Sequence, residues 1–338
     1  MPAYINSIHS ISPYVPGSPV RPGSLAAPDP AYAEVISPAE LRRMPRLVKM
    51  GLYAATRSLA QAGLDRVDAI AVGSGLGSFE GFDKFETALI TQAEGTVPPT
   101  PFIQSLDNAV AGQIALKLQC YGYNMTYTHR GFSFETALLD GMLLLAEADG
   151  PTNVLVGGLD ETTPTYAALL QRAGHVKSTP EAVEYGSTPG VQPGEGATFL
   201  VLSSERQPGT LATVRAVRTL FRPATALEVE HAVAALLREQ RLTPADLDLV
   251  LLGHSGDAEA DQKLRAVEFS LLGTQPREYF KNYCGEYHTA SAFALWLGVS
   301  RLTTAAETDS LYGPPPKTCL IVNHYRDTNY SFMLITRD

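Results

Sequence analysis

The chain has 338 residues, of which 45% are hydrophobic and 18% are charged, and it carries a formal net charge of −9. This length predicts one large domain or two fused domains, and the composition is that of a globular protein rather than a disordered or fibrous one. The acidic balance argues against a partner as negatively charged as nucleic acid.

The first 36 residues are rich in Pro, Gly, Ser and Tyr and show little periodicity, so residues 1–36 are expected to form an irregular N-terminal segment. They also lack the basic stretch and the apolar core of a secretory signal. The longest apolar runs elsewhere, residues 141–146 and 290–299, are far shorter than the roughly 18 residues that a membrane span requires. These features predict a cytoplasmic protein without a membrane span.

Regular structure is predicted from residue 37 onward. The run Ser37-Pro38-Ala39-Glu40 is a capping box with proline at the first helical position. A second helix begins after Pro45 and ends at Gly63, with apolar residues at the spacing of one buried face. Residues 69–72 then form a buried strand that ends in a glycine-rich turn.

The same order of elements returns later in the chain. A helical face within residues 229–236 precedes a buried strand at residues 249–252. Two helices, within residues 134–146 and 290–299, are apolar on every side and are each followed by a strand. A helix of this kind must be covered on every side, so both are expected to lie between sheets.

Alternation of strands and helices implies parallel sheets with right-handed crossovers. We therefore predict an α/β protein made of two pseudo-repeated halves, residues 37–206 and 207–338. With a buried helix in each half, the halves are expected to stack as a layered α/β/α/β/α sandwich.

The three cysteines, Cys120, Cys284 and Cys319, are far apart and have no CxxC spacing. This excludes a disulfide framework or a thiolate zinc site, and no motif calls for a metal or a cofactor. Cys284 and Cys319 lie in apolar segments, where cysteine usually behaves as a small hydrophobic residue. The open question is whether any of the three is a nucleophile.

Three motifs resemble the β-ketoacyl synthases of the thiolase-like superfamily. They are SLDNAVAGQ at residues 105–113, VLVGGLDE at residues 154–161 and GEGA at residues 194–197. Their order and spacing place the resemblance over about residues 38–335. It implies a thiolase-like five-layer sandwich for the fold and acyl-group chemistry, or a relative of it, for the function.

The resemblance implies a catalytic cysteine at the start of the first buried helix, where a helix N-terminus lowers the pKa of the thiol. That position falls near Gly131 or Phe132, and no cysteine is present there. Cys120 lies about a dozen residues earlier. Ser133 is adjacent, but a serine needs a neighbouring base to act as a nucleophile.

Two histidines of the second half complete the family's site. The first corresponds to His254, which equally well satisfies a buried turn. The second position follows a lysine, which is retained as Lys281, but the histidine is replaced by Glu286. His288 lies two residues further on.

Four other residues are candidates for substrate binding. His129 and Arg130 replace the small residues expected before the nucleophile, so they would fill the pocket or bind a carboxylate. Asn323 and Tyr325 lie in a segment where the family carries a flexible glycine-rich loop. Bulky and charged residues there predict an altered or closed acyl channel.

The missing cysteine motivates the main hypothesis, a ketosynthase homologue without condensing activity of its own. It would resemble the chain length factors that pair with an active ketosynthase in polyketide, aryl polyene or related pigment or fatty-acid-type biosynthesis. The expected partners are an active ketosynthase subunit or a second copy of the chain, with residues 98–112 suited to that contact, and an acyl carrier protein.

A basic cluster is the candidate for docking the carrier protein, although such clusters are more often solvated helix faces. It comprises Arg42, Arg43, Arg46 and Lys49. The alternative to the main hypothesis is a divergent acyl-transfer, decarboxylating or hydrolytic enzyme that uses Ser133, His254 and Glu286. A structural or binding role on the same fold is a third possibility.

Overall fold

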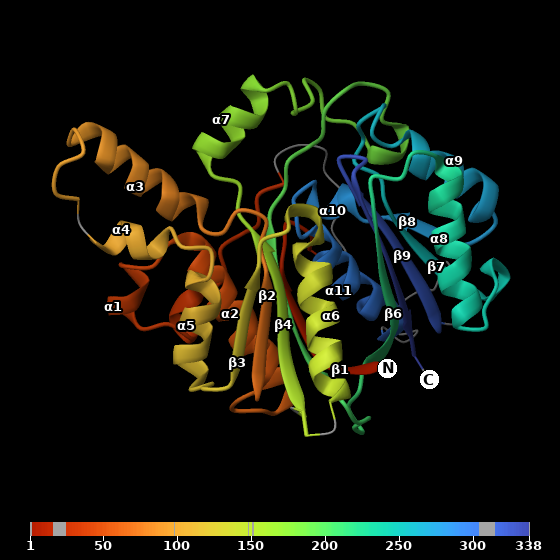
Figure 1. The fold of residues 1–338 in the computed structure, drawn as a ribbon, viewed down its shortest axis with the longest axis horizontal. Helices are drawn as coiled ribbons and strands as arrows, with labels where there is room; N and C mark the ends of the chain where they lie inside the picture. The colour runs from red at the N-terminus through yellow and green to blue at the C-terminus, as the bar shows by residue number, and fades with distance from the viewer. Residues whose placement is uncertain are drawn as a thin grey trace.

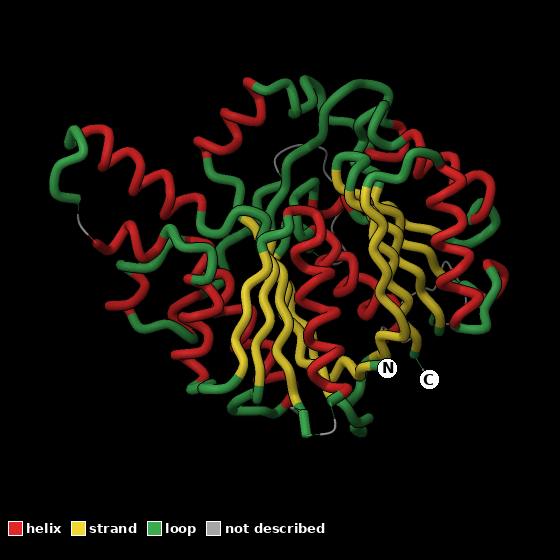
Figure 2. Tube along the Cα trace, in the orientation of Figure 1, coloured by secondary structure: helices red, strands yellow, loops and turns green. Residues whose placement is uncertain are grey.

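The computed structural model describes residues 2–15, 25–97, 99–147, 149–150, 152–303 and 315–337, arranged around one ten-stranded sheet (Figures 1 and 2). The strands are β1 (Ala3–Ile11), β2 (Ala69–Gly73), β3 (Tyr123–Tyr127), β4 (Asn153–Asp160), β5 (Gly196–Ser203), β6 (Ala212–Phe221), β7 (Leu249–Gly253), β8 (Arg277–Tyr279), β9 (Thr318–Tyr325) and β10 (Asn329–Thr336). The helices are α1 (Pro38–Leu41), α2 (Arg46–Ala62), α3 (Phe79–Thr91), α4 (Pro99–Gln104), α5 (Ala109–Leu118), α6 (Ser133–Ala146), α7 (Pro164–Arg172), α8 (Ala226–Glu239), α9 (Gln262–Leu271), α10 (Lys281–Cys284) and α11 (Ala290–Thr303).

The strand order confirms that the two halves repeat one another. It runs β3-β2-β4-β5-β1-β6-β10-β9-β7-β8, so each half places its first strand in the middle and its third strand at an edge. β1 and β6 meet there as an antiparallel pair in which Ala3 lies opposite Val214. Within each half, the second, third and fourth strands are parallel and the fifth is antiparallel to the fourth.

Three hydrophobic clusters confirm the predicted five layers. α2 and α5 cover the first half of the sheet on one side, and α8 and α9 cover the second half on the other. Between the two halves lie the apolar helices α6 and α11, as the sequence predicts, and they share one core with strands of both halves. Figure 1 shows these layers from one side of the molecule to the other.

Local signals for the helix ends are also confirmed. Ser37 and Glu40 form the predicted capping box of α1, and Gly63 ends α2 in the left-handed conformation, with φ of 67°. The other predicted strands lie in the sheet within a few residues of their expected bounds.

The expectation of an irregular N-terminal segment is wrong for its first part. β1 lies in the interior of the sheet between β5 and β6, so the first half begins at β1 rather than at residue 37. The strand is difficult to recognise because both of its faces are covered and several inward positions are polar. Asn6 donates a hydrogen bond to Ser203, and Ser7 shares one with Ser58. Residues 16–24 lie outside the described residues.

The parallel strands position the candidate site. β2 and β4 of one half and β7 and β9 of the other end at the same side of the molecule, below α7 (Figure 1). In open α/β sheets, ligands bind outside the carboxyl ends of the strands. Among the described residues, none of the helices has the length and apolar character needed to cross a bilayer.

Candidate functional site

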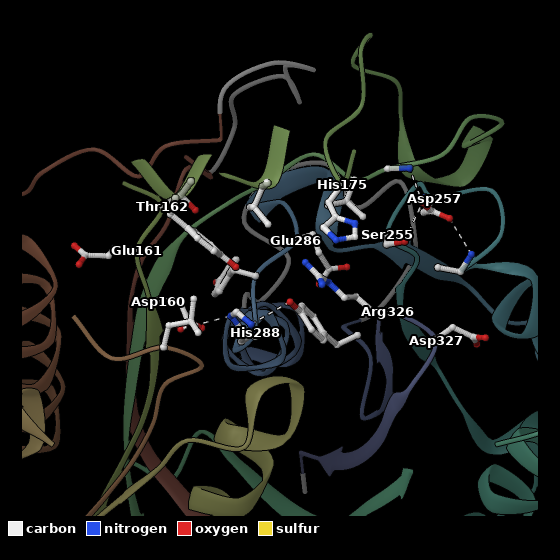
Figure 3. Close-up of a pocket in the computed structure, with 18 of the residues that line it drawn as sticks. Asp160, Glu161, Thr162, His175, Ser255, Asp257, Glu286, His288, Arg326 and Asp327 are labelled. Atoms are coloured by element: carbon white, nitrogen blue, oxygen red, sulfur yellow. Dashed lines mark hydrogen bonds and ion pairs between the residues drawn. The ribbon is translucent and has the colours of Figure 1, made fainter. Parts of the chain in front are cut away.

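A cavity of about 360 Å³ lies at the carboxyl ends of these strands, where loops of both halves meet (Figure 3). Its wall includes residues that end or follow β2, β4, β7 and β9, residues before α11, and Tyr166 and Leu170 of α7. They include Gly77, Asp160, Glu161, Thr162, Tyr166, His175, Ser255, Asp257, Glu286, His288, Tyr325, Arg326 and Asp327. A volume of this size is sufficient for a small ligand.

Asp160, at the end of β4, joins the two halves beneath the cavity. One carboxylate oxygen accepts a hydrogen bond of 2.7 Å from the Gly75 amide. The other accepts bonds of 2.9 and 2.8 Å from the amide and the hydroxyl of Thr289, at the start of α11. No larger residue fits at Gly75, because a Cβ there would lie 2.1 Å from Cγ of His288.

His288 and Tyr325 form a hydrogen-bonded pair in the wall of the cavity. Nε2 of His288 and the Tyr325 hydroxyl are 3.0 Å apart, and the ring centroids are 4.7 Å apart. Burial lowers the pKa of His288, although Asp160, whose carboxylate is 4.0 Å from Nδ1, partly opposes this. The imidazole is therefore neutral near pH 7.

Lys281 and Glu286 form a buried ion pair, of which Glu286 belongs to the cavity wall. The Lys281 ammonium donates to Oε2 of Glu286 at 2.8 Å and to the His324 carbonyl at 2.6 Å. Burial raises the pKa of Glu286, and the charge of Lys281 opposes that change. Lys281, the lysine that the resemblance predicts, is thus paired with Glu286, the residue that replaces the family's histidine.

A second buried carboxylate, Asp261, organises the loop after β7. It accepts hydrogen bonds from the amides of Ser255 and Gly256, at 2.8 and 2.9 Å, and from the Ser255 hydroxyl. His324 Nε2 also lies 2.8 Å from Asp261, and the Asp327 amide donates to Nδ1, so Nε2 carries the proton. Burial favours the neutral acid, but the hydrogen bonds and charges of His254 and His324 outweigh it and hold the pKa of Asp261 far below its ordinary value.

His254, the first predicted histidine, belongs to this network rather than to the cavity wall. Its Nε2 lies 2.8 Å from Glu268 on α9, and its ring packs 5.5 Å from that of Tyr279. Burial lowers its pKa, but the flanking carboxylates Asp261 and Glu268 outweigh burial and raise it. The structure thus places His254 in a buried turn, which is the second interpretation that the sequence left open.

The turn before α6, where the resemblance implies the nucleophile, contains no thiol. Ser133 is buried, and its hydroxyl donates to the Arg130 carbonyl at 2.8 Å. Gly131 packs against Tyr325, since a Cβ there would lie 2.5 Å from the Tyr325 Cβ. Phe132 points instead toward Phe221, with ring centroids 6.3 Å apart.

The three cysteines lie elsewhere and are all buried as free thiols. Burial raises the pKa of both Cys284 and Cys319 well above the ordinary value for a thiol. A thiol held neutral is a poor nucleophile. Among the described residues, no group of three or more His, Cys, Asp and Glu side chains is arranged to hold a metal ion.

Of the four residues proposed for substrate binding, only Tyr325 lies in the cavity wall. Tyr325 lines the cavity, whereas Asn323 is buried inside β9 and His129 lies on the surface, with Nδ1 3.3 Å from the Thr136 hydroxyl. Arg130 is exposed beside the turn before α6. The cavity therefore receives only part of the predicted set.

The four residues of the basic cluster do not share one exposed surface. Arg46 is used internally, in ion pairs of 2.9 Å with Asp29 and with Glu195 of the GEGA motif. Lys49 lies over the ring of Tyr32. Arg42 and Arg43 remain exposed.

Several residues of the site were not singled out from the sequence. Asp160 and Glu195 lie inside motifs that carry the resemblance, but nothing in their spacing indicates which side chains they bind. His324 and Arg326 lie in the loop that departs from the family pattern. Tyr166 carries no sequence signal, because its place in the cavity depends on the position of α7.

An apolar surface surrounds β3, the strand at one edge of the sheet. Its exposed side chains, here called the β3 edge surface, are Phe102, Ile103, Leu106, Leu116, Tyr121, Tyr123, Met125 and Leu143. They come from α4, α5, β3 and α6, together with the loops beside α4 and α5. A groove of about 700 Å³ between α1, α2, α4 and α5 continues this surface. Residue 98, the first of the predicted contact segment, is outside the described residues.

The family model described as β-ketoacyl synthase, N-terminal domain, matches residues 25–207, which are just over half of the chain. No curated protein matches the chain by sequence.

Solved structures that resemble the chain include the ishigamide ketosynthase/chain length factor, with a TM-score of 0.79 and 15% identity over 100% of this chain and 99% of that one. Another is a ketosynthase, ApeO, in complex with its chain length factor, ApeC, from Xenorhabdus doucetiae, with a TM-score of 0.78 and 17% identity over 99% and 98% of the two chains. A β-ketoacyl synthase from Burkholderia phymatum gives a TM-score of 0.78 and 17% identity over 99% of both chains. At these identities, the likeness shows that the fold is shared.

Proposed function

Since the chain belongs to the β-ketoacyl synthase family, we propose that it is a non-condensing subunit, similar to a chain length factor, that pairs with an active ketosynthase. The observation that carries this proposal is the turn before α6. Condensation requires a nucleophile that accepts the acyl chain, and a thiolate at a helix N-terminus suits that task. The turn here offers only Ser133, whose hydroxyl bonds to the backbone.

The second half of the site supports the same proposal. A decarboxylating histidine would need a free imidazole in the cavity. The position that the resemblance assigns to it holds Glu286, whose carboxylate is paired with Lys281. His254, the other candidate, is hydrogen-bonded to Glu268 on the far side of the loop. Glu286 lines the cavity as a carboxylate rather than an imidazole, and His254 lies outside the cavity wall.

The β3 edge surface is the proposed contact with the ketosynthase. An edge strand presents unpaired backbone groups, and a broad exposed apolar patch is typical of a surface that a partner covers. β3 exposes Tyr123, Asn124 and Met125, of which Tyr123 and Met125 are large apolar side chains. The resembling ishigamide and ApeO structures are described as a ketosynthase with a chain length factor, which favours a heterodimer over a pair of identical chains.

Arg42 and Arg43 remain the proposed contact for an acyl carrier protein. They are the exposed members of the basic cluster in a chain of net charge −9, and neither forms an ion pair with a described residue. One resembling structure is described as a type II polyketide ketosynthase in complex with its acyl-carrier protein. The proposed setting is polyketide, aryl polyene or related pigment or fatty-acid-type biosynthesis.

Co-expression with a candidate active ketosynthase from the same genome tests the proposal. We expect a stable complex of one copy of each chain, and acyl and malonyl groups condensed by the complex but not by this chain alone. Condensation by the purified chain would contradict the non-condensing role. Failure to co-purify, or a stable dimer of identical chains in the presence of the ketosynthase, would contradict the pairing.

One observation favours a second function, that of a divergent enzyme of acyl transfer, decarboxylation or hydrolysis. The neutral imidazole of His288 and the hydroxyl of Tyr325 are hydrogen-bonded in the cavity wall, as general acid–base pairs are. Turnover of an acyl thioester by the chain alone, abolished by Tyr325→Phe or by His288→Gln, would support this function. Equal background hydrolysis with and without the chain would exclude it for that substrate.

A further inference from the structure

Helix α7, which lies above the layers of the fold, is weakly supported by the rest of the chain (Figure 1). Among the described helices of nine or more residues, it is the only one without a buried residue. No described helix or strand packs along its length. A helix this short depends on packing for its stability. α7 is therefore held in place less firmly than the other helices.

α7 separates the cavity at the carboxyl ends of the strands from a second cavity. Tyr166 and Leu170 line the first one. Ala167 and Gln171 line the second, which the described residues leave with a volume of about 440 Å³. The far wall of this second cavity includes residues 191–195. Close-packed interiors resist displacement because they contain few voids, but α7 has open space on both sides.

The chain is fixed before and after α7. Before the helix, the Thr162 amide donates a hydrogen bond of 3.0 Å to the Glu195 carboxylate. After the helix, the Val191 amide donates one of 2.9 Å to the His175 carbonyl. The segment between these two anchors, residues 163–174, is here called the α7 flap. Its ends are fixed, so any movement of the flap must occur between them.

Two side-chain contacts hold the α7 flap against another element, among the hydrogen bonds and ring contacts of the described residues. The Thr165 hydroxyl donates to Asp83 at 3.0 Å, and the Tyr166 ring lies 5.1 Å from that of Phe79. Both partners belong to α3, whose single buried residue is Gly81. The flap is thus fastened to a helix that is itself mostly uncovered.

The two ends of the α7 flap have the character of pivots. Thr163 is the N-cap of α7 and has an extended backbone. Gly174, beyond the other end, has φ of 73°, and no described atom lies within 4 Å of the position that a Cβ would take. Glycine changes its φ and ψ at little cost, and hinges are often a few such residues at the ends of elements.

We propose that the α7 flap opens and closes the cavity at the carboxyl ends of the strands, and that it withdraws into the second cavity when it opens. Thr163 and Gly174 are the pivots. In the closed position, Tyr166 and Leu170 complete the wall of the first cavity. Flaps of this kind control access to enclosed sites. The device uses residues of one chain only, so it does not depend on the proposed pairing with a ketosynthase.

The rate at which a reagent reaches the cavity tests the proposal in the purified full chain. The three natural cysteines are all buried, so a thiol introduced by Leu76→Cys in the cavity wall can be labelled selectively. N-Ethylmaleimide is the reagent, and the wild-type chain gives the background. We expect the introduced thiol to react more slowly than glutathione does, because it is reached only while the flap is open.

Filling the second cavity should hold the flap closed. Added to Leu76→Cys, Ala167→Phe is expected to slow the labelling by about tenfold. Ala168→Phe is the matched control, since Ala168 is the next residue of the same helix but is exposed and lines neither cavity. It should leave the rate within about twofold. Thermal unfolding confirms that each variant is folded.

Releasing the flap should have the opposite effect. Asp83→Ala removes the acceptor of the Thr165 hydroxyl and is expected to speed the labelling by about fivefold. Glu86→Ala is the control, because Glu86 lies on the same helix and has no hydrogen-bond partner among the described residues. If Ala167→Phe does not fold, the comparison of these two variants decides the matter by itself.

Four results would overturn the proposal. They are labelling as fast as that of glutathione, no labelling in any variant, equal rates in Ala167→Phe and Ala168→Phe, and an unchanged rate in Asp83→Ala. The first would mean that the cavity is always open, and the second that it does not open. None of these results bears on whether the chain co-purifies with a ketosynthase.

Discussion

The region beneath the cavity and the β3 edge surface differ in how far their groups are satisfied within the chain. Beneath the cavity, the buried carboxylates Asp160 and Asp261 each accept several hydrogen bonds, from Gly75 and Thr289 in the first case and from Ser255, Gly256 and His324 in the second. At the edge, Tyr123 and Met125 are exposed on a strand with no neighbour on one side. The region beneath the cavity, here called the closed region, has its buried carboxylates hydrogen-bonded within the chain. The β3 edge surface, here called the open region, leaves apolar side chains and one side of a strand uncovered.

The other edge of the sheet shows that exposure is not a necessary consequence of an edge. β8 has three residues, and its charged side chains are paired: Arg277 with Glu268 and Glu278 with Arg301. A short, charged edge strand resists further pairing. The chain thus blocks one edge of its sheet and leaves the other apolar, which is the pattern expected of a subunit that binds one partner.

The largest effect is expected from breaking the closed region at Asp261. Asp261→Asn leaves the amides of Ser255 and Gly256 with a weaker acceptor and turns an amide N–H₂ toward these donors. Because the group is fully buried, the free energy of unfolding should fall by about 4 kcal/mol. Chemical denaturation measures this fall.

Asp65→Asn is the matched control, since Asp65 is exposed and should change stability by less than about 0.5 kcal/mol. Equal stability of the two variants would show that Asp261 does not organise the loop after β7.

The second prediction concerns Glu161 in the cavity wall. Burial raises its pKa from 4.5 to about 7, so the folded protein holds this proton more tightly than the unfolded chain does. The resulting stabilisation is complete below pH 4.5 and is lost as the pH rises through about 7, a change of about 3 kcal/mol. Denaturation at several pH values should show this slope.

Glu161→Gln should remove this contribution, and Glu205→Gln, at an exposed glutamate, should retain it. A slope that is the same in all three proteins would mean that Glu161 titrates as it does in the unfolded chain.

The third prediction tests the open region. Met125→Glu places a charge on β3, where the proposed ketosynthase would have to bury it. We expect the affinity for the ketosynthase to fall by at least about 100-fold, or about 2.7 kcal/mol, with little change in thermal stability. Phe269→Glu is the control, because Phe269 is 90% exposed on α9, away from β3. An equal loss of binding in both variants would contradict the assignment of the interface to β3.

Much of the fold could be predicted because its signals are local. The capping box at Ser37, the glycine that ends α2 and the two helices that are apolar on every side all depend on neighbouring residues. β1 was missed because its burial on both faces is a property of the whole sheet. Its serine and asparagine side chains are satisfied by residues that are distant in sequence, such as Ser203.

The site was less predictable, because its composition depends on the direction of each side chain. His254 follows a strand as expected, yet its ring turns toward Glu268 on α9. Arg46 looks like a surface charge in sequence, but Glu195, 149 positions later, pairs with it. Neither direction is encoded in the spacing of the motifs.

The smallest effect on stability is expected at Ser133, which lies where the resemblance implies the nucleophile. In Ser133→Ala the hydroxyl bond to the Arg130 carbonyl is lost, but that carbonyl keeps the bond from the Ser133 amide. A structural hydroxyl of this kind contributes about 1 kcal/mol to the free energy of unfolding, and the complex with the ketosynthase should keep its activity. Denaturation and condensation assays of the same variant separate the two roles. Loss of condensation or of acyl turnover with unchanged stability would make Ser133 a catalytic residue, because a hydroxyl that serves only the turn cannot affect chemistry without affecting folding.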